Sequence, residues 1–161
     1  MNFKTLNLKS EAKEKAMQWC SRKECCCKEM HDKALSWGCS PNEARELLDF
    51  LIEQKFVDER RYTEAFVRDK LRFNKWGRVK IVYMLRMQNI DKKMIMDALS
   101  EIDQTEYQQI LSSELQKKFK PIRHQNPFEI SGKLFRFAVS KGFEPEMINE
   151  EIFKLTKKNE K

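Results

Sequence analysis

The chain has little glycine and little proline, with four of each among its 161 residues. Both residue types concentrate in turns and loops, so a β-sandwich or β-barrel with many tight turns is disfavoured. The composition is 40% hydrophobic and 35% charged, which is typical of a folded chain rich in helix-forming residues. The scarcity of turn residues therefore predicts an all-α fold.

Motifs of catalytic sites are also missing. The chain has two histidines, His31 and His124, and it lacks a glycine-rich phosphate loop, a nucleophile elbow and a His-Glu metal motif. Its many carboxylates fall at expected helix starts and on polar faces, where capping and solvation account for them. We therefore expect a protein that is not an enzyme and that needs no cofactor.

Long apolar runs are absent as well. The first residues, MNFKTLNLKSEAKEK, contain no apolar core of a secretory signal, and no uncharged apolar run approaches the roughly 18 residues of a membrane span. The sequence thus predicts a cytoplasmic protein that does not enter a membrane and whose thiols stay reduced.

The five cysteines lack a Cys-x-x-Cys spacing, and four of them lie within eight positions: Cys20, Cys25, Cys26 and Cys27. Cys27 and His31 are i, i+4 neighbours on an expected helix, which could suggest zinc. Adjacent cysteines on a helix point in different directions, however, and cannot share one tetrahedral site. We therefore interpret the cysteines as small packing residues and expect no metal.

A helical pattern recurs three times with a period of about fifty residues. Gly38, Asn89 and Gly142 each close a helix with a residue type that tolerates the left-handed conformation. An apolar residue and then the start of the next helix follow each of them. Apolar residues recur at matching positions: Met30, Ile81 and Leu134; Ala34, Leu85 and Ala138; Ala44, Ile95 and Ile148; Leu48, Leu99 and Ile152; and Leu51, Ile102 and Leu155.

These positions predict three tandem three-helix repeats that stack into an elongated, curved array. The expected units are a flexible arm (1–9), a first repeat (10–57), a second repeat (58–103), a third repeat (104–157) and a tail (158–161). Ser10 and Ser40 are expected to cap helices, the second of them followed by Pro41 at the first helical position. A further helix is expected over 23–37.

One helix of the second repeat, expected over 59–73, has apolar residues on two sides. Tyr62, Ala65, Phe66 and Phe73 form its predicted buried stripe. Val67 and Leu71 lie on another side, which would be exposed in an isolated bundle. We therefore expect Val67 and Leu71 to pack against a neighbouring repeat. Asp69 projects near the buried stripe without an evident partner.

The second repeat also carries the positive charge. Residues 60–93 contain eleven basic and three acidic side chains, a net charge of +8 that exceeds the +7 of the whole chain. At about 100° per residue, Arg61, Arg68, Arg72 and Lys75 fall on one side of the first helix. Guanidinium groups bind phosphates and carboxylates bidentately. A solvated helical face is the alternative explanation of this charge.

The order of residues in this stretch resembles the RecX family of regulators of RecA recombinase. The matching positions are Asp58, Glu59, Arg61, Tyr62, Ala65, Phe66, Val67, Arg68, Gly77, Ile81, Leu85, Ile90 and Asp91. Asn89 stands where the family usually has glycine. The first repeat matches more loosely, at Arg22, Lys23 and Glu24, and the third matches in periodicity and charge.

The resemblance implies a regulator without an active site. Such a protein would bind RecA and lie in the groove of its filament on DNA. It would inhibit ATP hydrolysis and strand exchange and favour filament disassembly. Single- and double-stranded DNA are further expected partners, and we expect a monomer. The leading contact residues are basic side chains of the second repeat: Arg61, Arg68, Arg72, Lys75, Arg78, Lys80 and Arg86.

Two other functions fit the same surface. A three-helix unit can dock a helix in a DNA groove without a protein partner. An adapter that binds another acidic protein would also be an elongated molecule with a basic surface. The sequence leaves both functions open beside the regulator of RecA.

Overall fold

The computed structural model describes residues 3–158, and for residues 3–9 and 158 it describes the backbone alone. In this part of the chain the secondary structure is helical, and no β-strand occurs. The helices are α1 (Phe3–Arg22), α2 (Cys27–Ser36), α3 (Pro41–Glu53), α4 (Glu59–Arg72), α5 (Arg78–Met87), α6 (Lys92–Ser100), α7 (Gln104–Phe119), the 3₁₀ helix η1 (Lys120–Ile122), α8 (Pro127–Lys141) and α9 (Pro145–Lys158).

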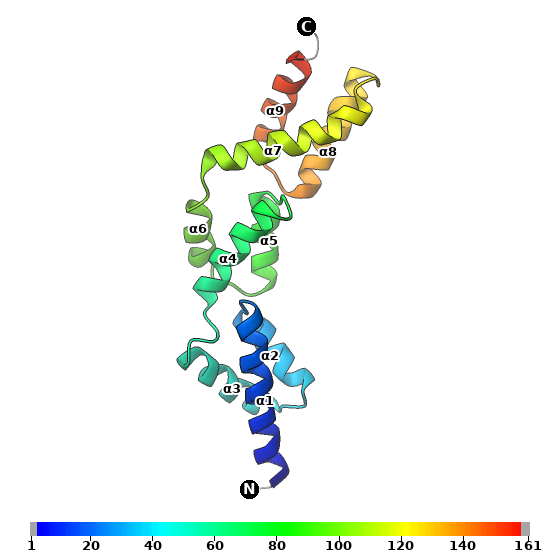
Figure 1. Cartoon of the computed structure of the whole chain (residues 1–161). Coiled ribbons are helices and arrows are strands. Elements are labelled where there is room, and N and C mark those ends of the chain that lie inside the picture. The colour runs from blue at the N-terminus through cyan, green and yellow to red at the C-terminus, as the bar shows by residue number, and fades with distance from the viewer. Residues whose placement is uncertain (1–2, 159–161) are drawn as a thin grey trace.

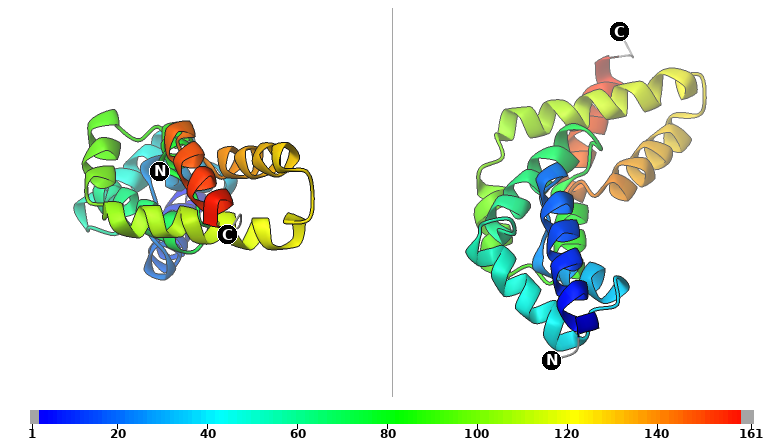
Figure 2. Two further views of the ribbon diagram at one scale, coloured as in Figure 1. Left: turned by 90° about the horizontal axis from the view of Figure 1, so that it is seen from above. Right: turned by 60° about the horizontal axis from the view of Figure 1, so that its bottom comes forward.

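The helices form three groups of three that follow one another along an elongated molecule, with α1 at one end and α9 at the other (Figure 1). Most helix–helix contacts lie within a group. Seen from a second direction, the array is bowed (Figure 2, right). The all-α, elongated array of three-helix repeats that the sequence predicts is therefore confirmed.

The three helix ends that define the period have the same backbone geometry. Gly38, Asn89 and Gly142 have φ angles of 91°, 58° and 90°, all in the left-handed region. After each of them the next amide bonds the carbonyl five residues back at 3.2 Å: Cys39 to Ala34, Ile90 to Leu85, and Phe143 to Ala138. This Schellman arrangement satisfies the last helical carbonyls in each repeat.

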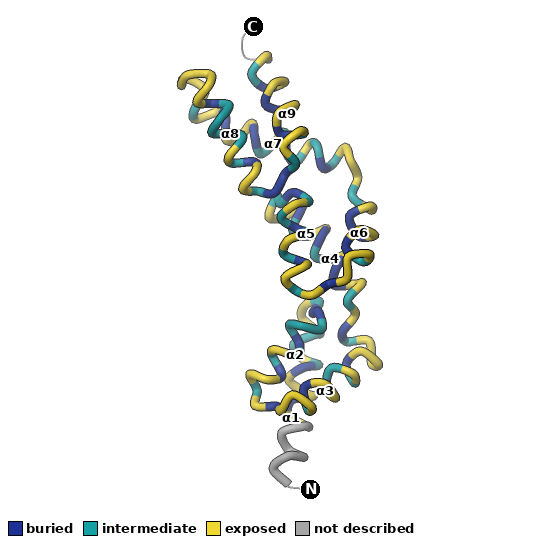
Figure 3. Tube along the Cα trace, turned by 180° about the vertical axis from the view of Figure 1, so that it is seen from behind, coloured by how far each residue is buried: buried dark blue, intermediate teal, exposed yellow. Residues whose placement is uncertain are grey.

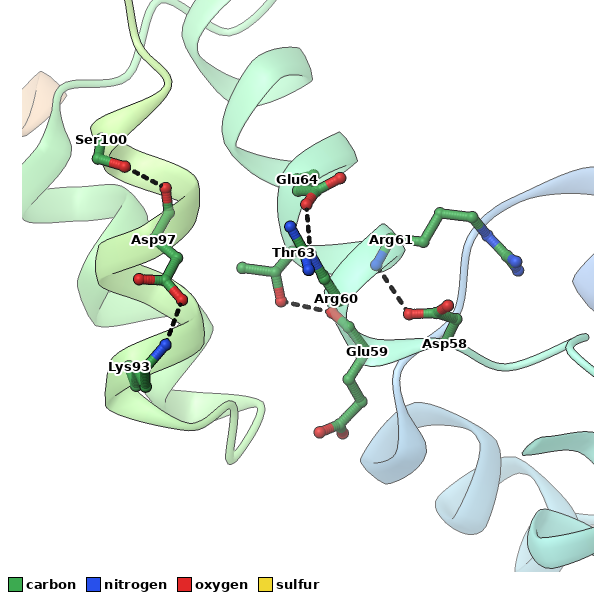
Figure 4. Close-up of polar contacts among 9 residues, drawn as sticks. All are labelled: Asp58, Glu59, Arg60, Arg61, Thr63, Glu64, Lys93, Asp97 and Ser100. Atoms are coloured by element: carbon green, nitrogen blue, oxygen red, sulfur yellow. Dashed lines mark hydrogen bonds and ion pairs between the residues drawn. The ribbon is translucent and has the colours of Figure 1, made fainter. Parts of the chain in front are cut away.

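Several helix starts are capped by side chains, as the sequence predicts at Ser40. The Ser40 hydroxyl accepts from the Glu43 amide, the Glu43 carboxylate accepts from the Ser40 amide, and Pro41 follows. Asp58 caps α4 by accepting from the Arg61 amide at 3.0 Å (Figure 4). Asp103 caps α7 in the same way.

The buried side chains form two hydrophobic cores. The second and third repeats share one core, and the first repeat has its own, which runs from Ala12 to Val57. Cys26 is the first-repeat residue that enters the shared core. Figure 3 follows the buried positions along the helices. The second and third repeats are thus joined by apolar packing, whereas the first repeat is joined to them mainly by polar contacts.

Three predicted boundaries are wrong. Helix α1 begins at Phe3, so residues 3–9 are helical and Ser10 lies inside a helix rather than capping one; residues 1 and 2 lie outside the described residues. Helix α2 begins at Cys27, because Cys26 takes the extended conformation of an N-cap. Helix α9 includes Lys158, and the rest of the expected tail lies outside the described residues.

The predicted buried stripe of α4 is wrong at Phe73. Phe73 is 79% exposed, because α4 ends at Arg72 and Phe73 lies beyond the packed turns. Val67 and Leu71 are buried in the core that the second and third repeats share, and they line one pocket together with Ala98 of α6 and Glu106 of α7. Asp69, which had no evident partner, bonds Arg68 Nε at 3.1 Å.

Candidate protein and nucleic-acid interface

The contact between the second and third repeats, here the C-terminal joint, brings the start of α5 against the end of α8. The Gly77 amide donates to the Lys141 carbonyl at 2.8 Å, and the Val79 amide donates to the Gly142 carbonyl at 3.0 Å. Amides at a helix start have no partner within their own helix. The last carbonyls of α8 therefore satisfy the first amides of α5.

Tyr107 of α7 completes the C-terminal joint. Its hydroxyl accepts from the Arg78 amide at 2.9 Å and donates to Glu144 Oε2 at 2.5 Å. Burial and the hydrogen bond to Glu144 raise the pKa of Tyr107 above its ordinary value. The Arg78 guanidinium lies 3.9 Å from the Tyr107 ring centroid and bonds Glu144 at 3.1 Å and Gln104 at 2.8 Å. Arg78 is thus engaged inside the molecule.

Arg72 also contacts the third repeat. Its Nε donates to Glu106 Oε1 at 2.7 Å, and a second guanidinium nitrogen donates to Oε2 at 3.2 Å. The hydrogen bond with Glu106 raises the pKa of Arg72. Two parallel bonds fix the orientation of both side chains. Arg72 therefore links α4 to α7 across the C-terminal joint.

The contact between the first and second repeats, here the N-terminal joint, is polar. Arg61 Nε donates to Glu24 Oε1 at 2.7 Å, and the same guanidinium donates to the carbonyls of Lys55 and Phe56. Figure 4 shows the Arg61 side chain extending away from α6. The Cys27 amide donates to Glu59 at 3.3 Å. Arg61 therefore holds the first repeat against the second.

Each joint contains a tyrosine at the same position of its repeat. Tyr62 and Tyr107 both lie four residues after an aspartate N-cap, and both are buried. Tyr62 donates to Glu29 at the start of α2 at 3.4 Å. Tyr107 makes two shorter bonds, one with the Arg78 amide at the start of α5 and one with Glu144 just before α9. The same tyrosine position thus links two repeats at each joint, and its hydrogen bonds are shorter at the C-terminal joint.

Replacing Tyr107 with phenylalanine should lower the free energy of unfolding by about 1–3 kcal/mol, because the Arg78 amide and the Glu144 carboxylate lose a buried partner. The matched Tyr62→Phe variant should lose less than about 1 kcal/mol, since its bond is longer. Guanidinium denaturation of both variants measures the difference. Equal losses would contradict the assignment of tighter bonding to the C-terminal joint.

The other four predicted contact residues are placed differently. Arg68 is exposed and bonds its neighbour Asp69. Lys75 lies beyond α4 with a φ of 57°, so the expected row of four cations on one helix is interrupted. Lys80 and Arg86 lie on α5, and neither forms an ion pair with a described residue. Lys80 Nζ contacts the Ser140 carbonyl at 3.5 Å.

Two further basic residues of the stretch are neutralised locally. Arg60 pairs with Glu64 and Lys93 pairs with Asp97, each at 2.9 Å and each one helical turn apart (Figure 4). Lys70 and Lys80 instead lie 5.0 and 4.6 Å from the ring centroid of Trp76. Trp76 is partly buried and packs against the shared core.

The outer side of α5 carries an exposed surface that the sequence interpretation missed. Val79, Tyr83 and Met87 are 56%, 61% and 57% exposed. At about 100° per residue, these three residues, Lys80 and Arg86 together occupy an arc of about 120° around the axis of α5. We call these five residues the α5 face. Their i, i+4, i+8 spacing could have revealed the apolar row. It also matches a buried stripe, so the sequence did not distinguish the two.

The described part of the chain was also compared with the requirements of a metal site and of a membrane span. No group of three His, Cys, Asp or Glu side chains there is arranged to hold a metal ion. None of the described helices combines the length and the apolar character that a membrane span requires.

Comparison with known proteins identifies the family. The model of the second three-helix domain of RecX matches residues 58–99, and that of the third matches residues 105–152. Regulatory protein RecX of Clostridium tetani is 32% identical over 130 residues, covering 80% of this chain and 59% of the relative. RecX of Vibrio parahaemolyticus is 25% identical over 138 residues, covering 86% and 87%.

Solved structures share the fold. The crystal structure of RecX from Lactobacillus salivarius superposes with a TM-score of 0.80 at 21% identity, over 94% of this chain and 98% of that one. The chain spans about three fifths of the length of its clostridial relatives. The two matched domains, the relatives and the shared architecture agree, and the chain belongs to the RecX family of regulatory proteins.

Proposed function

We propose that this chain regulates RecA recombinase by binding RecA and its filament on DNA. In this role it inhibits ATP hydrolysis and strand exchange and favours filament disassembly, without a catalytic site of its own. Membership of the RecX family and the elongated array of repeats support this role. We further propose that it acts as a monomer in the cytoplasm.

The observation that carries the proposal is the α5 face. Protein interfaces combine apolar and aromatic contacts with arginine, and depend little on surface charge alone. On the α5 face, Tyr83 and Met87 supply apolar area beside Arg86. Lys80 lies at the edge nearest the C-terminal joint, where its ammonium group can meet a phosphate or a carboxylate.

The arginines of the two joints have a second role in this proposal. Arg61, Arg72 and Arg78 set how the repeats are angled, because each bonds a residue of another repeat. A molecule that lies along a helical filament must match its curvature. We therefore expect these three residues to affect binding through shape, whereas Arg68, Lys75, Lys80 and Arg86 contact the partner.

The test is the ATPase activity of RecA on single-stranded DNA with increasing amounts of the purified chain at moderate salt. We expect inhibition that is complete at a stoichiometric dose. The cognate recombinase should also retain the chain in a pull-down, with and without DNA. Full ATPase activity at that dose would contradict the proposal.

A stand-alone DNA-binding module is the second candidate, favoured by the net charge of +8 over residues 60–93. It predicts tight DNA binding without RecA, with a log affinity that falls steeply with log salt. Fluorescence anisotropy on single- and double-stranded DNA measures this slope. An adapter for another acidic protein predicts neither ATPase inhibition nor tight DNA binding.

A further inference from the structure

The connection between α7 and α8 forms a second basic surface, in the third repeat. The two helices pack against each other, and the connection, which contains η1, projects to one side of the array (Figure 1; Figure 2, left). We call residues 117–136 the third-repeat tip. The tip has a net charge of +5, from one acidic side chain, Glu129, and six basic ones: Lys117, Lys118, Lys120, Arg123, Lys133 and Arg136. The C-terminal joint lies at the other end of α8, which has 15 residues and is therefore about 22 Å long.

Most cations of the third-repeat tip are not neutralised within the described part of the molecule. Lys117 pairs with Glu114 at 3.0 Å, and the other five form no ion pair with a described residue. Lys133 instead donates to the neutral side chain of Gln125. This differs from the second repeat, where glutamates of other repeats bind three of the arginines. Clustered cations without acidic partners attract a polyanion.

An aromatic ring lies among these cations. Phe128, in the first turn of α8, is 87% exposed. Gly132 and Arg136 follow it at i+4 and i+8, so the three residues lie on one side of α8. The nearest atom to a Cβ added at Gly132 would be Arg136 Nη1 at 3.4 Å, so the Arg136 side chain lies back over Gly132 toward Phe128. An open ring, a helix surface without a side chain and a guanidinium group therefore follow one another along α8.

We propose that the third-repeat tip binds single-stranded nucleic acid, with a base stacked on Phe128 and the neighbouring phosphates bound by Arg123 and Arg136. Aromatic rings that stack on bases, set among cations that bind the backbone, are the common means of binding single strands. In a duplex the bases stack on each other, and their faces are closed to a phenylalanine ring. A membrane surface fits less well, because Phe128 is the one exposed large apolar residue of the tip, which the structure describes throughout. This contact is separate from the α5 face and does not depend on RecA.

The first test is fluorescence anisotropy of the full chain, without RecA, on short oligothymidine and oligouridine strands and on an abasic strand of the same length. Phe128→Ala should weaken binding to the tighter-binding of the two base-containing strands at least about fivefold, because one stacked base is lost. Its affinity for the abasic strand should stay within about twofold of the parent. Phe153→Ala is the matched control, since Phe153 is 58% exposed on α9 of the same repeat, and it should bind as the parent does. An unchanged affinity of Phe128→Ala for the base-containing strand, or an equal loss on the abasic strand, would overturn the stacking.

The second test removes the charges. In Arg123→Gln, Arg136→Gln the slope of log affinity against log salt should become shallower by about 1.4, because each phosphate contact of a single strand contributes about 0.7. Lys15→Gln, Arg22→Gln removes the same charge from exposed positions of α1 and should keep the slope of the parent. Equal slopes in the tip variant and the parent would overturn the phosphate contacts. Binding of the parent to anionic phospholipid vesicles but to neither oligonucleotide would overturn the choice of partner. Since RecA is absent, these failures are distinct from a failure to inhibit RecA.

Discussion

Replacing Gly77 with alanine should lower the free energy of unfolding by about 2–4 kcal/mol and loosen the C-terminal joint. A Cβ atom at Gly77 would overlap the carbonyl of Gly142 and lie 2.5 Å from the Phe143 amide nitrogen. These are backbone atoms, so no flexible side chain can move aside. The φ of Gly77 is −80°, which alanine adopts freely. The loss therefore comes from contact between repeats and not from backbone strain.

The control for this variant is Gly132→Ala. Gly132 lies inside α8, and the nearest atom to an added Cβ is Arg136 Nη1 at 3.4 Å. Alanine there should leave the joint intact and stabilise the helix by about 0.5–1 kcal/mol. Chemical denaturation measures both changes. A Gly77→Ala variant as stable as the parent would contradict the backbone contact at the C-terminal joint.

On the proposed function, reversing two charges on the α5 face should weaken inhibition of RecA by about 10–100-fold. In the Lys80→Glu, Arg86→Glu variant, two cations that form no ion pair with a described residue become acids. The variant would then repel an acidic protein surface or DNA phosphate. The core should be unaffected, since Arg86 is exposed and Lys80 is partly exposed. Titration of RecA ATPase activity on single-stranded DNA gives the shift in the inhibitory dose.

Lys92→Glu, Lys93→Glu is the matched control, because it makes the same change in net charge within the same repeat. Both lysines are exposed on α6, which lies on a different side of the repeat from α5 (Figure 1). This variant should inhibit RecA within about threefold of the parent, as expected for screened long-range charge. Similar losses in the two variants would indicate that net charge, rather than the α5 face, governs binding.

The helix ends were predictable because their signals are local. A left-handed residue such as Asn89 or a capping serine such as Ser40 closes or opens a helix through bonds to residues three to five positions away. The start of α1 was not predictable in this way. Ser10 has the chemistry of a cap, yet the helix continues through it from Phe3.

The candidate site was predictable in part. Charge concentration drew attention to the second repeat, but it did not show which cations have partners within the molecule. Arg61, Arg72 and Arg78 bond glutamates that are 37, 34 and 66 residues away in the sequence. No local pattern identifies such pairs. The exposed row of Val79, Tyr83 and Met87 was missed because its spacing is also that of a buried stripe.

The sequence by itself determined the helical class, the period of about fifty residues and the location of the positive charge. These properties depend on composition and on neighbours within two helical turns. The tertiary structure decided that two repeats share one core while the first keeps its own. It also decided which arginines bind glutamate and which cations of α5 stay exposed. Those outcomes depend on how the repeats stack, and stacking joins residues that the chain keeps far apart.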